Sequence, residues 1–359
     1  MDALIVVPSL KVSGGVREAL RLAGDLRRGN CPASLLSMWA SPHRMETPVP
    51  VELLSDWPPR ASRAPVELPV LQYRFSRWLR SGGGGGDFGA AVFTHYATLP
   101  LCLLVPRRRR FFFVQDLEWY FVGNCVASAA LRSVVLAAYR TGRIISANAY
   151  LTEQLAKEGL EIAFEAPVWA DPLFSGVMDA PRDVDFVMVL RKGAHKRLDL
   201  YRQFIALACQ HGSRMVAITP EDELATLVRP DVSEVLLRPS ADEMMAVYGR
   251  SKCFVHLSEH EGFGLPPLEA MGSGCIPLCR DSGGVRAFMQ GGALEALLLP
   301  LEMPIQDVFA RGLGLVDNES ALATLRSVAK DRFEAGTRRC ADARAHLAEV
   351  LERESRRGT

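Results

Sequence analysis

The sequence predicts an α/β protein made of two doubly wound domains. Its 359 residues suffice for two domains of ordinary size, and 48% of them are hydrophobic, which supplies two cores. Short apolar segments alternate with helical segments in both halves, the pattern of parallel sheets covered by helices. Residues 166–174, with two prolines, are expected to link the halves. We therefore expect domains over residues 1–168 and 175–325, and a C-terminal helical segment over 326–359.

Composition excludes several classes of protein. Lys and Arg number 42 and Asp and Glu 41, so the net charge of +1 gives no reason to expect nucleic acid as a partner. The first ten residues lack a basic leader and are typical of a strand, and no apolar run approaches the ~20 residues of a membrane helix. The eight cysteines form no CxxC pair, so we expect reduced, mostly buried thiols in a cytoplasmic protein.

The chain begins with a strand over residues 3–8, a turn containing Gly14 and Gly15, and an amphipathic helix. These glycines follow the carboxyl end of a strand, where open parallel sheets bind ligands. A ligand-binding loop and an ordinary tight turn are both compatible with them. Residues 34–39 are predicted as the second strand.

A proline-rich stretch follows. Residues 41–69 contain seven prolines and are predicted as a loop or as short irregular elements. A helix is expected over residues 71–80, and the five glycines 82–86 then act as a flexible connector. A strand over residues 90–95 ends at His95, which can be a ligand contact or an ordinary strand-end histidine.

A buried strand is predicted over residues 111–114, and polar Gln115, Asp116 and Glu118 follow its carboxyl end. The preceding arginines 107–110 can dock on anionic lipid or form a solvated turn. A helix over residues 126–140, a strand ending at Ser146 and Asn148, and another helix complete the first half.

The second half repeats the alternation. Arg191 and Lys196 follow its first strand and could neutralise a diphosphate, with Lys192 and Arg197 as alternatives one position away. The DxD string at residues 183–185 precedes that strand, at the opposite edge from the ligand, and we assign no metal to it. The predicted strands are residues 185–190, 215–219, 234–237 and 254–257, and the predicted helices are residues 199–210, 221–228, 241–250 and 319–353.

The most specific stretch is residues 256–274, HLSEHEGFGLPPLEAMGSG, which predicts a strand, a glycine-rich loop and a helix. The loop offers the Glu261 carboxylate, and prolines 266 and 267 suit the first turn of the helix. The free N–H groups of a helix N-terminus attract phosphate. Glu269 lies eight residues after Glu261, so the two carboxylates can reach different parts of one extended polar ligand. Ser282, Gly283 and Gly284 form a further turn at this edge.

The motif EGFGLPPLEAM, followed by the strand-like CIPLC, resembles the signature of family 4 glycosyltransferases, which use nucleotide-sugar donors and retain anomeric configuration. The resemblance implies two facing Rossmann-like domains of the B-type architecture, with a C-terminal helix crossing back. It assigns Glu261 to the donor sugar, Glu269 to the ribose, and Arg191 and Lys196 to the diphosphate. Gln115 stands where many relatives have a histidine near the reacting carbon. Since glutamine cannot accept a proton, it can orient or polarise but not act as a base.

The resemblance implies two groups of site residues. Those implied in catalysis are Glu261, Arg191, Lys196, Gln115 and Asp116, and those implied in donor binding are Gly14, Gly15, His95, Arg238, Gly262, Phe263, Gly264, Leu265 and Glu269. No metal and no cofactor are expected, because the nucleoside diphosphate sugar is a co-substrate and the two cations and the helix N-terminus face its diphosphate.

The expected function is retaining transfer of a hexosyl unit, with rhamnosyl and mannosyl among the options, to a glycan or lipid-linked acceptor in polysaccharide or glycoconjugate synthesis. The FVQD sequence at residues 113–116 resembles a subset that builds rhamnose-containing polysaccharides. Peripheral contact with the inner face of the cell membrane is a further expectation. The alternatives are a nucleotide-sugar epimerase on a similar frame and a catalytically silent nucleotide-sugar-binding partner.

Overall fold

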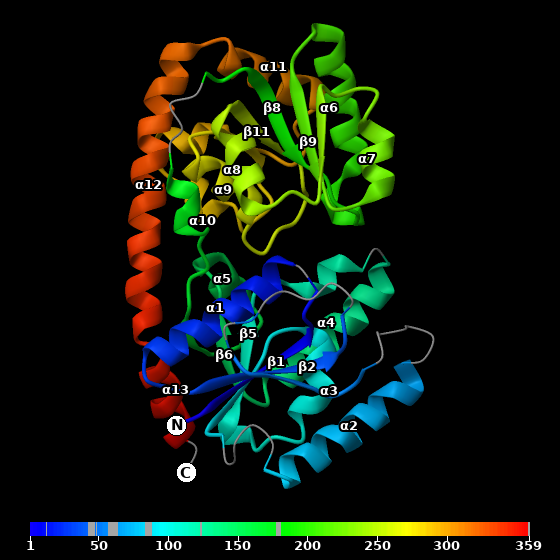
Figure 1. The fold of residues 1–359 in the computed structure, drawn as a ribbon, viewed down its shortest axis with the longest axis vertical. Helices are drawn as coiled ribbons and strands as arrows, with labels where there is room; N and C mark the ends of the chain where they lie inside the picture. Colours follow the sequence, from blue (N-terminus) through cyan, green and yellow to red (C-terminus); the bar gives the residue numbers. More distant parts are fainter. Residues whose placement is uncertain are drawn as a thin grey trace. The chain divides into compact units, whose positions relative to one another are not determined.

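In a computed structural model the chain forms two compact units (Figure 1). Unit 1 comprises residues 1–119, 124–168 and 340–359, and unit 2 comprises residues 120–123 and 169–339. Residues 326–359 were expected as a separate helical segment. Residues up to 339 belong to unit 2, and residues from 340 belong to unit 1. The structure describes residues 1–11, 13–41, 47, 49–56, 64–82, 88–122, 124–176 and 181–357, so part of the proline-rich stretch and glycines 83–86 lie outside the described residues.

Unit 1 contains a seven-stranded sheet in the order β3-β2-β1-β4-β5-β6-β7, and every pairing in it is parallel. Both faces of such a sheet are covered by helices, so its strands are continuous apolar runs such as RFFFV in β5. The strands are β1 (Ala3–Ser9), β2 (Ala33–Trp39), β3 (Val51–Leu53), β4 (Ala90–Phe93), β5 (Arg110–Val114), β6 (Arg143–Ser146) and β7 (Ile162–Glu165).

The described helices of unit 1 flank this sheet. They are α1 (Gly14–Arg28), α2 (Ala64–Arg80), α3 (Leu99–Cys102), α4 (Cys125–Tyr139), α5 (Ala149–Lys157) and α13 (Leu347–Arg356), with short 3-10 turns η3 (Tyr96–Thr98) and η4 (Arg107–Arg109). A further 3-10 turn, η5 (Glu118–Phe121), begins in unit 1 and ends in unit 2. Two expectations for residues 41–80 were wrong in detail. The stretch 41–69 contains strand β3, and α2 begins at Ala64 rather than at residue 71. Pro65 stands in the first turn of α2, where a helix tolerates proline.

Unit 2 contains a six-stranded sheet in the order β10-β9-β8-β11-β12-β13, again with every pairing parallel. Its strands are β8 (Val184–Val189), β9 (Met215–Thr219), β10 (Glu234–Leu237), β11 (Ser251–His256), β12 (Ile276–Arg280) and β13 (Leu298–Leu299). Its described helices are α6 (Leu198–His211), α7 (Asp222–Val228), α8 (Ala241–Gly249), α9 (Leu265–Gly272), α10 (Arg286–Met289), α11 (Ile305–Val316) and most of α12 (Glu319–Ala345). The doubly wound parallel architecture predicted from the sequence is confirmed for both sheets.

The strand order reverses once in each sheet. The reversal lies between β1 and β4 in unit 1 and between β8 and β11 in unit 2. At such a switch point the loops leave the carboxyl ends of neighbouring strands in opposite directions, which leaves room for a ligand. A ligand site is therefore expected at these two places.

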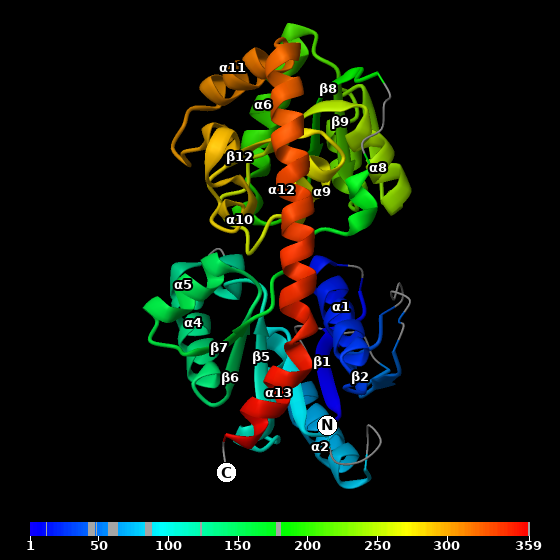
Figure 2. The same cartoon turned by 90° about the vertical axis from the view of Figure 1, so that its left-hand side faces the viewer.

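The C-terminal residues are anchored in unit 1 by Arg344, near the end of α12. Its guanidinium is buried, with a side chain 6% exposed, and contacts Glu18 at 2.8 Å and Asp25 at 3.0 Å, both from α1. Its Nε also donates to the carbonyl of Pro167 at 2.8 Å. Helix α13 follows directly from the red end of α12 (Figure 2) and packs against α1. The last residues of the chain are therefore part of the unit 1 core.

Replacing Arg344 with methionine is expected to lower the free energy of unfolding by about 3–5 kcal/mol, because the buried Glu18 would lose its buried cation. Glu18 would keep only the more exposed Arg21, at 3.3 Å. Urea unfolding followed by circular dichroism measures the change. Arg338→Met is the matched control, since Arg338 lies on the same helix, 70% exposed, in a loose pair with Glu334. Equal unfolding midpoints for the two variants would contradict the anchoring role.

Candidate active site

Lys196 and Glu261 meet at the switch point of unit 2. Lys196 closes the 3-10 turn η7 (Ala194–Lys196) after β8, and Glu261 follows β11, the neighbouring strand. The Lys196 ammonium donates to Glu261 Oε1 at 2.8 Å. The two loops are also joined through their backbones, because the Glu259 amide donates to the His195 carbonyl at 2.8 Å. Two residues that the sequence assigned to different parts of a donor are thus in direct contact.

The loop that carries Glu261 rests on the turn after β12. The Glu261 amide donates to the Ser282 carbonyl at 2.9 Å, and the Gly284 amide donates to the Glu261 carbonyl at 3.0 Å. A Cβ on Gly284 would lie 2.4 Å from the backbone carbon of Gly262, so only glycine fits there. The turn at residues 282–284, expected at this edge, therefore supports Glu261 through main-chain contacts.

Gly284→Ala is expected to lower the melting temperature and turnover together, because backbone would have to move away from the new methyl group. Overpacking of this kind costs about 1–3 kcal/mol. Thermal unfolding and a rate assay on one preparation test it. Gly314→Ala serves as the control, since a Cβ on Gly314 meets nothing within 4 Å. If both alanine variants have the same melting temperature and turnover, the close approach of the two loops does not require glycine at position 284.

Glu261 is an ionised carboxylate whose side chain is largely enclosed, 15% exposed. Burial alone would raise its pKa, but the charge of Lys196, the neighbouring His256 and hydrogen bonds from Lys196 and Ser258 outweigh burial and lower the pKa of Glu261 to about 2. His256 Nε2 lies 3.5 Å from Glu261 Oε1. Burial lowers the pKa of His256 to about 4, so this imidazole is neutral near pH 7. Lys196 is therefore the cation that balances Glu261 at neutral pH.

Helix α9 begins immediately after this loop. Its N-cap, Gly264, has φ +88°, and a Cβ there would lie 2.8 Å from Val285 Cγ1, so both conformation and space require glycine. Leu265 and the two prolines form the first turn, and Glu269 is buried one turn further on, 4% exposed. Phe263 packs edge-on against Trp169, with ring centroids 5.9 Å apart, so its ring belongs to the core of unit 2.

The other predicted cations differ in their surroundings. Arg191 is exposed and makes no ion pair with any residue in the described ranges, so it is available to a ligand. Its alternative Lys192 pairs with Glu223. Arg197, the alternative to Lys196, has left-handed backbone and pairs with Asp199 at 2.9 Å. Arg238, proposed near the base, also has positive φ and pairs with Asp222.

In unit 1 the predicted residues gather at the carboxyl ends of three neighbouring strands. Gly14 and Gly15 follow β1, His95 follows β4, and Gln115 and Asp116 follow β5. Gly14 is the first residue of α1, which Ser13 caps by accepting from the Val16 amide at 3.3 Å. A Cβ on Gly15 would lie 3.4 Å from Gln115 Oε1, which places these two residues side by side.

His95 contacts its neighbours in unit 1 through both ring nitrogens. Its Nδ1 accepts from the Ala97 amide at 3.1 Å, and its Nε2 lies 3.6 Å from Glu118 Oε1. Burial lowers the pKa of His95 to about 4 and raises the pKa of Glu118 well above its ordinary value. Glu118 also accepts from the Tyr96 amide at 2.7 Å, and Asp116 accepts from the Leu117 amide at 2.8 Å. A neutral histidine and a buried carboxyl group therefore line this edge.

The arginines 107–110 and the DxD string at residues 183–185 lie at the amino ends of β5 and β8. Of the arginines 107–110, Arg110 is buried and donates to the Val105 carbonyl at 2.8 Å, so the expectation of four surface charges was wrong. Asp183 and Asp185 of the DxD string pair with Arg214 and Lys252. Within the described residues, no group of three or more His, Cys, Asp or Glu side chains could hold a metal ion.

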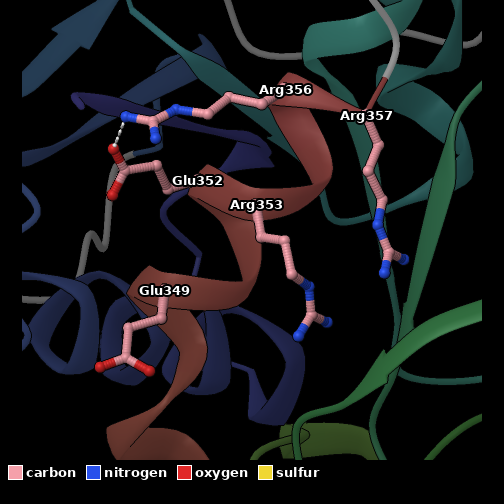
Figure 3. A pocket seen from close by; sticks show the side chains of 5 residues that line it. All are labelled: Glu349, Glu352, Arg353, Arg356 and Arg357. Atoms are coloured by element: carbon pink, nitrogen blue, oxygen red, sulfur yellow. Dashed lines mark hydrogen bonds and ion pairs between the residues drawn. The ribbon is translucent and has the colours of Figure 1, made fainter.

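A hollow of about 470 Å³ lies on α13 and is lined by Glu349, Glu352, Arg353, Arg356 and Arg357 (Figure 3). Arg356 pairs with Glu352, and Arg353 and Arg357 pair with Glu354. Helix α13 packs against η4, which precedes β5, so the hollow lies toward the amino edge of the unit 1 sheet. It is therefore separate from the residues described above.

The strand-loop-helix segment has known relatives. Residues 223–299, which contain Lys252, the Glu261 loop and α9, match the model of the family "Glycosyl transferases group 1". This segment is therefore similar to the group 1 glycosyl transferases. The match confirms the resemblance to family 4 stated from the EGFGLPPLEAM motif.

Two curated mannosyltransferases align with part of the chain. The GDP-mannose:cellobiosyl-diphosphopolyprenol alpha-mannosyltransferase of Komagataeibacter xylinus is 31% identical over 121 residues, 31% of each protein. The enzyme of the same name from Xanthomonas oryzae pv. oryzae (strain PXO99A) is 39% identical over 51 residues, 14% of this chain and 13% of that protein. The chain thus matches less than a third of the length of either relative.

Solved structures extend the likeness to the whole fold. Sucrose-phosphate synthase from Thermosynechococcus elongatus superposes with a TM-score of 0.78 at 14% identity, covering 98% of each chain. Anabaena Alr3699/HepE, solved in complex with UDP and glucose, gives 0.73 at 14% identity, covering 98% of this chain and 99% of that one. The chain has the B-type glycosyltransferase fold, as the sequence predicted.

Sequence reasoning missed His256 as a neighbour of Glu261. It is the last residue of β11, buried and directed at Glu261. A polar residue directly after the apolar run at residues 253–255 of a central strand, at the ligand edge, is the signal that could have indicated it.

Proposed function

We propose that the protein is a retaining glycosyltransferase that moves a hexosyl unit from a nucleoside diphosphate sugar to an acceptor hydroxyl. The observation that supports this best is the contact between Lys196 and Glu261 at the switch point of unit 2. It brings a cation and a carboxylate to the start of α9, whose N-terminal N–H groups suit phosphate. Glu269, buried in the same helix, is proposed to hold the ribose hydroxyls.

In the proposed reaction the bond between the anomeric carbon and the diphosphate oxygen breaks, and a bond from the acceptor oxygen to the same carbon forms. Negative charge then accumulates on the diphosphate, where Lys196, Arg191 and the amides of Gly264 and Leu265 stabilise it. The acceptor proton passes to a departing phosphate oxygen, which leaves on the face that the acceptor enters. Glu261 holds hydroxyls of the donor sugar.

The unit 1 residues serve the sugar and the acceptor in this proposal. Gln115 orients the donor sugar, since an amide cannot take the proton. Asp116 and His95 bind hydroxyl groups, and Gly14 and Gly15 let the backbone approach the ligand. The named activity of the two mannosyltransferases makes GDP-mannose the first donor to test, with dTDP-rhamnose and UDP-glucose as alternatives. A glycan or lipid-linked molecule is the proposed acceptor.

Peripheral contact with anionic lipid stays a prediction. No helix among the described residues is long and apolar enough to cross a membrane. Arg107 and Arg108 are exposed, and α4 carries exposed Val126 and Val134, 74% and 62% exposed. Basic and apolar side chains on one unit suit a lipid interface.

Turnover should survive chelation. Lys196, Arg191 and the α9 N-terminus supply the positive charge that a divalent metal would supply. Asp116 and Glu118, at the ligand edge of unit 1, are the carboxyl groups that could bind Mg²⁺ on the donor instead. Rates with EDTA, and with Mg²⁺ or Mn²⁺ restored, decide between the two. A complete loss that a metal reverses would overturn metal independence.

A thermal-shift screen of nucleoside diphosphate sugars tests the proposed function, followed by incubation with the donor that raises the melting temperature most. Release of nucleoside diphosphate supports glycosyl transfer. Conversion of the donor to its epimer would identify an epimerase, and binding without turnover over a panel of acceptors would identify a silent partner. If no nucleoside diphosphate sugar shifts the melting temperature, the proposal fails.

A further inference from the structure

We propose that His256 is a positioning residue, which holds the Glu261 carboxylate toward the donor sugar while the Lys196 ammonium is engaged by the diphosphate. The inference rests on the proposed function, because it assigns Lys196 to the diphosphate. It concerns a residue that neither the glycine-rich loop nor the Glu269 helix contains.

The observation behind this proposal is that the buried Nε2 of His256 lacks a hydrogen-bond partner in the described part of the chain. His256 is 5% exposed. The nearest acceptor is Glu261 Oε1 at 3.5 Å, slightly beyond an ordinary hydrogen bond. A buried donor without a partner is costly, so a central strand of this kind would ordinarily end in an apolar residue.

The groups around the imidazole decide its protonation. Glu261 faces it from the loop, Lys196 from η7 and Cys279 from the paired position on β12. Tyr201 of α6 lies nearby and accepts from the Leu257 amide at 3.0 Å. Because the ring is neutral, it has one N–H, and a carboxylate beside Nε2 favours the proton on that nitrogen.

Lys196 and His256, the two groups beside Glu261 Oε1, differ in how freely they can move. Lys196 is a flexible ammonium with three donors, of which the diphosphate competes for some or all. His256 is fixed on a rigid strand, and a shift of a few tenths of an ångström brings Nε2 to normal hydrogen-bond distance. As Lys196 turns toward phosphate, the imidazole N–H becomes the donor that keeps the enclosed carboxylate oriented. Orientation within about 0.5 Å is what productive sugar contacts need.

The test compares His256→Leu, which removes the donor at similar volume, with His256→Gln, which restores an N–H. We expect the leucine variant to lose about 10–100-fold in kcat, the range typical of losing an outer partner of a functional group. Its Kd for free nucleoside diphosphate should stay within about twofold, because the imidazole contacts neither phosphate nor ribose in this scheme. The glutamine variant should regain most of kcat. His346→Leu, at a 69% exposed histidine, is the control.

Each outcome is decisive. Wild-type kcat in the leucine variant overturns the inference, and so does an equal loss in both variants, with melting temperatures reduced in proportion, which indicates packing alone. If the wild-type protein neither binds nor turns over any nucleoside diphosphate sugar, the proposed function fails and the inference fails with it. Donor turnover in the wild type together with an unaffected leucine variant refutes the inference alone.

Discussion

Replacing Lys196 with alanine is expected to lower kcat by about 10²–10³-fold, the usual loss when one group that stabilises developing charge is removed. The ammonium contacts Glu261 Oε1 at 2.8 Å, so its loss also removes the cation that balances a largely enclosed carboxylate. Both effects act on the step in which the diphosphate leaves. Initial rates at saturating donor measure the change.

The control for Lys196 is Lys252→Ala. Lys252 is a similarly half-buried lysine of unit 2 that pairs with Asp185 at 3.1 Å, but it lies near the amino ends of β11 and β8, away from the ligand edge. It should keep near wild-type kcat. A Lys196 variant with normal turnover and lowered stability would show that the pair with Glu261 is only structural.

Glu269→Ala is expected to weaken the binding of free nucleoside diphosphate by about 1–3 kcal/mol, because the ribose hydroxyls lose a charged acceptor. Isothermal titration with UDP and GDP measures the affinity. Glu269 is buried in α9, so Glu269→Gln, which keeps the volume, separates lost charge from lost packing. Glu243→Ala, an exposed capping residue of α8, is the control. Unchanged affinity in both Glu269 variants excludes the ribose assignment.

Much of the fold was predictable because its central strands are buried on both faces. β1 and β5 therefore contain continuous apolar runs, which are visible in the sequence. The strands that were missed, β3, β7 and β13, lie at sheet edges and have two to four residues. Such strands carry too few buried residues for a pattern to emerge. In α2, prolines 65 and 69 concealed the first turns of the helix.

The candidate site was predictable where its residues lie close together in the sequence. The strand, the glycine loop and α9 follow one another in sequence, so Glu261 and Glu269 could be placed from residues 256–274 alone. The contact between Glu261 and Lys196 joins residues 65 positions apart and depends on strand order, which spacing does not reveal. The ring of Phe263, expected at the donor, packs in the core because Trp169 and Phe288 lie beside it.

In the proposed function, this protein transfers a hexosyl unit with retention of configuration. The most direct measurement is ¹H NMR of the reaction with the donor that the thermal-shift screen selects, because the anomeric signal of the product reports the configuration of the new glycosidic bond. An α-linked nucleoside diphosphate hexose should give an α-configured product, at a rate that falls together with kcat in the Lys196→Ala variant. A β-configured product, or an epimerised donor with no transfer, would contradict the account.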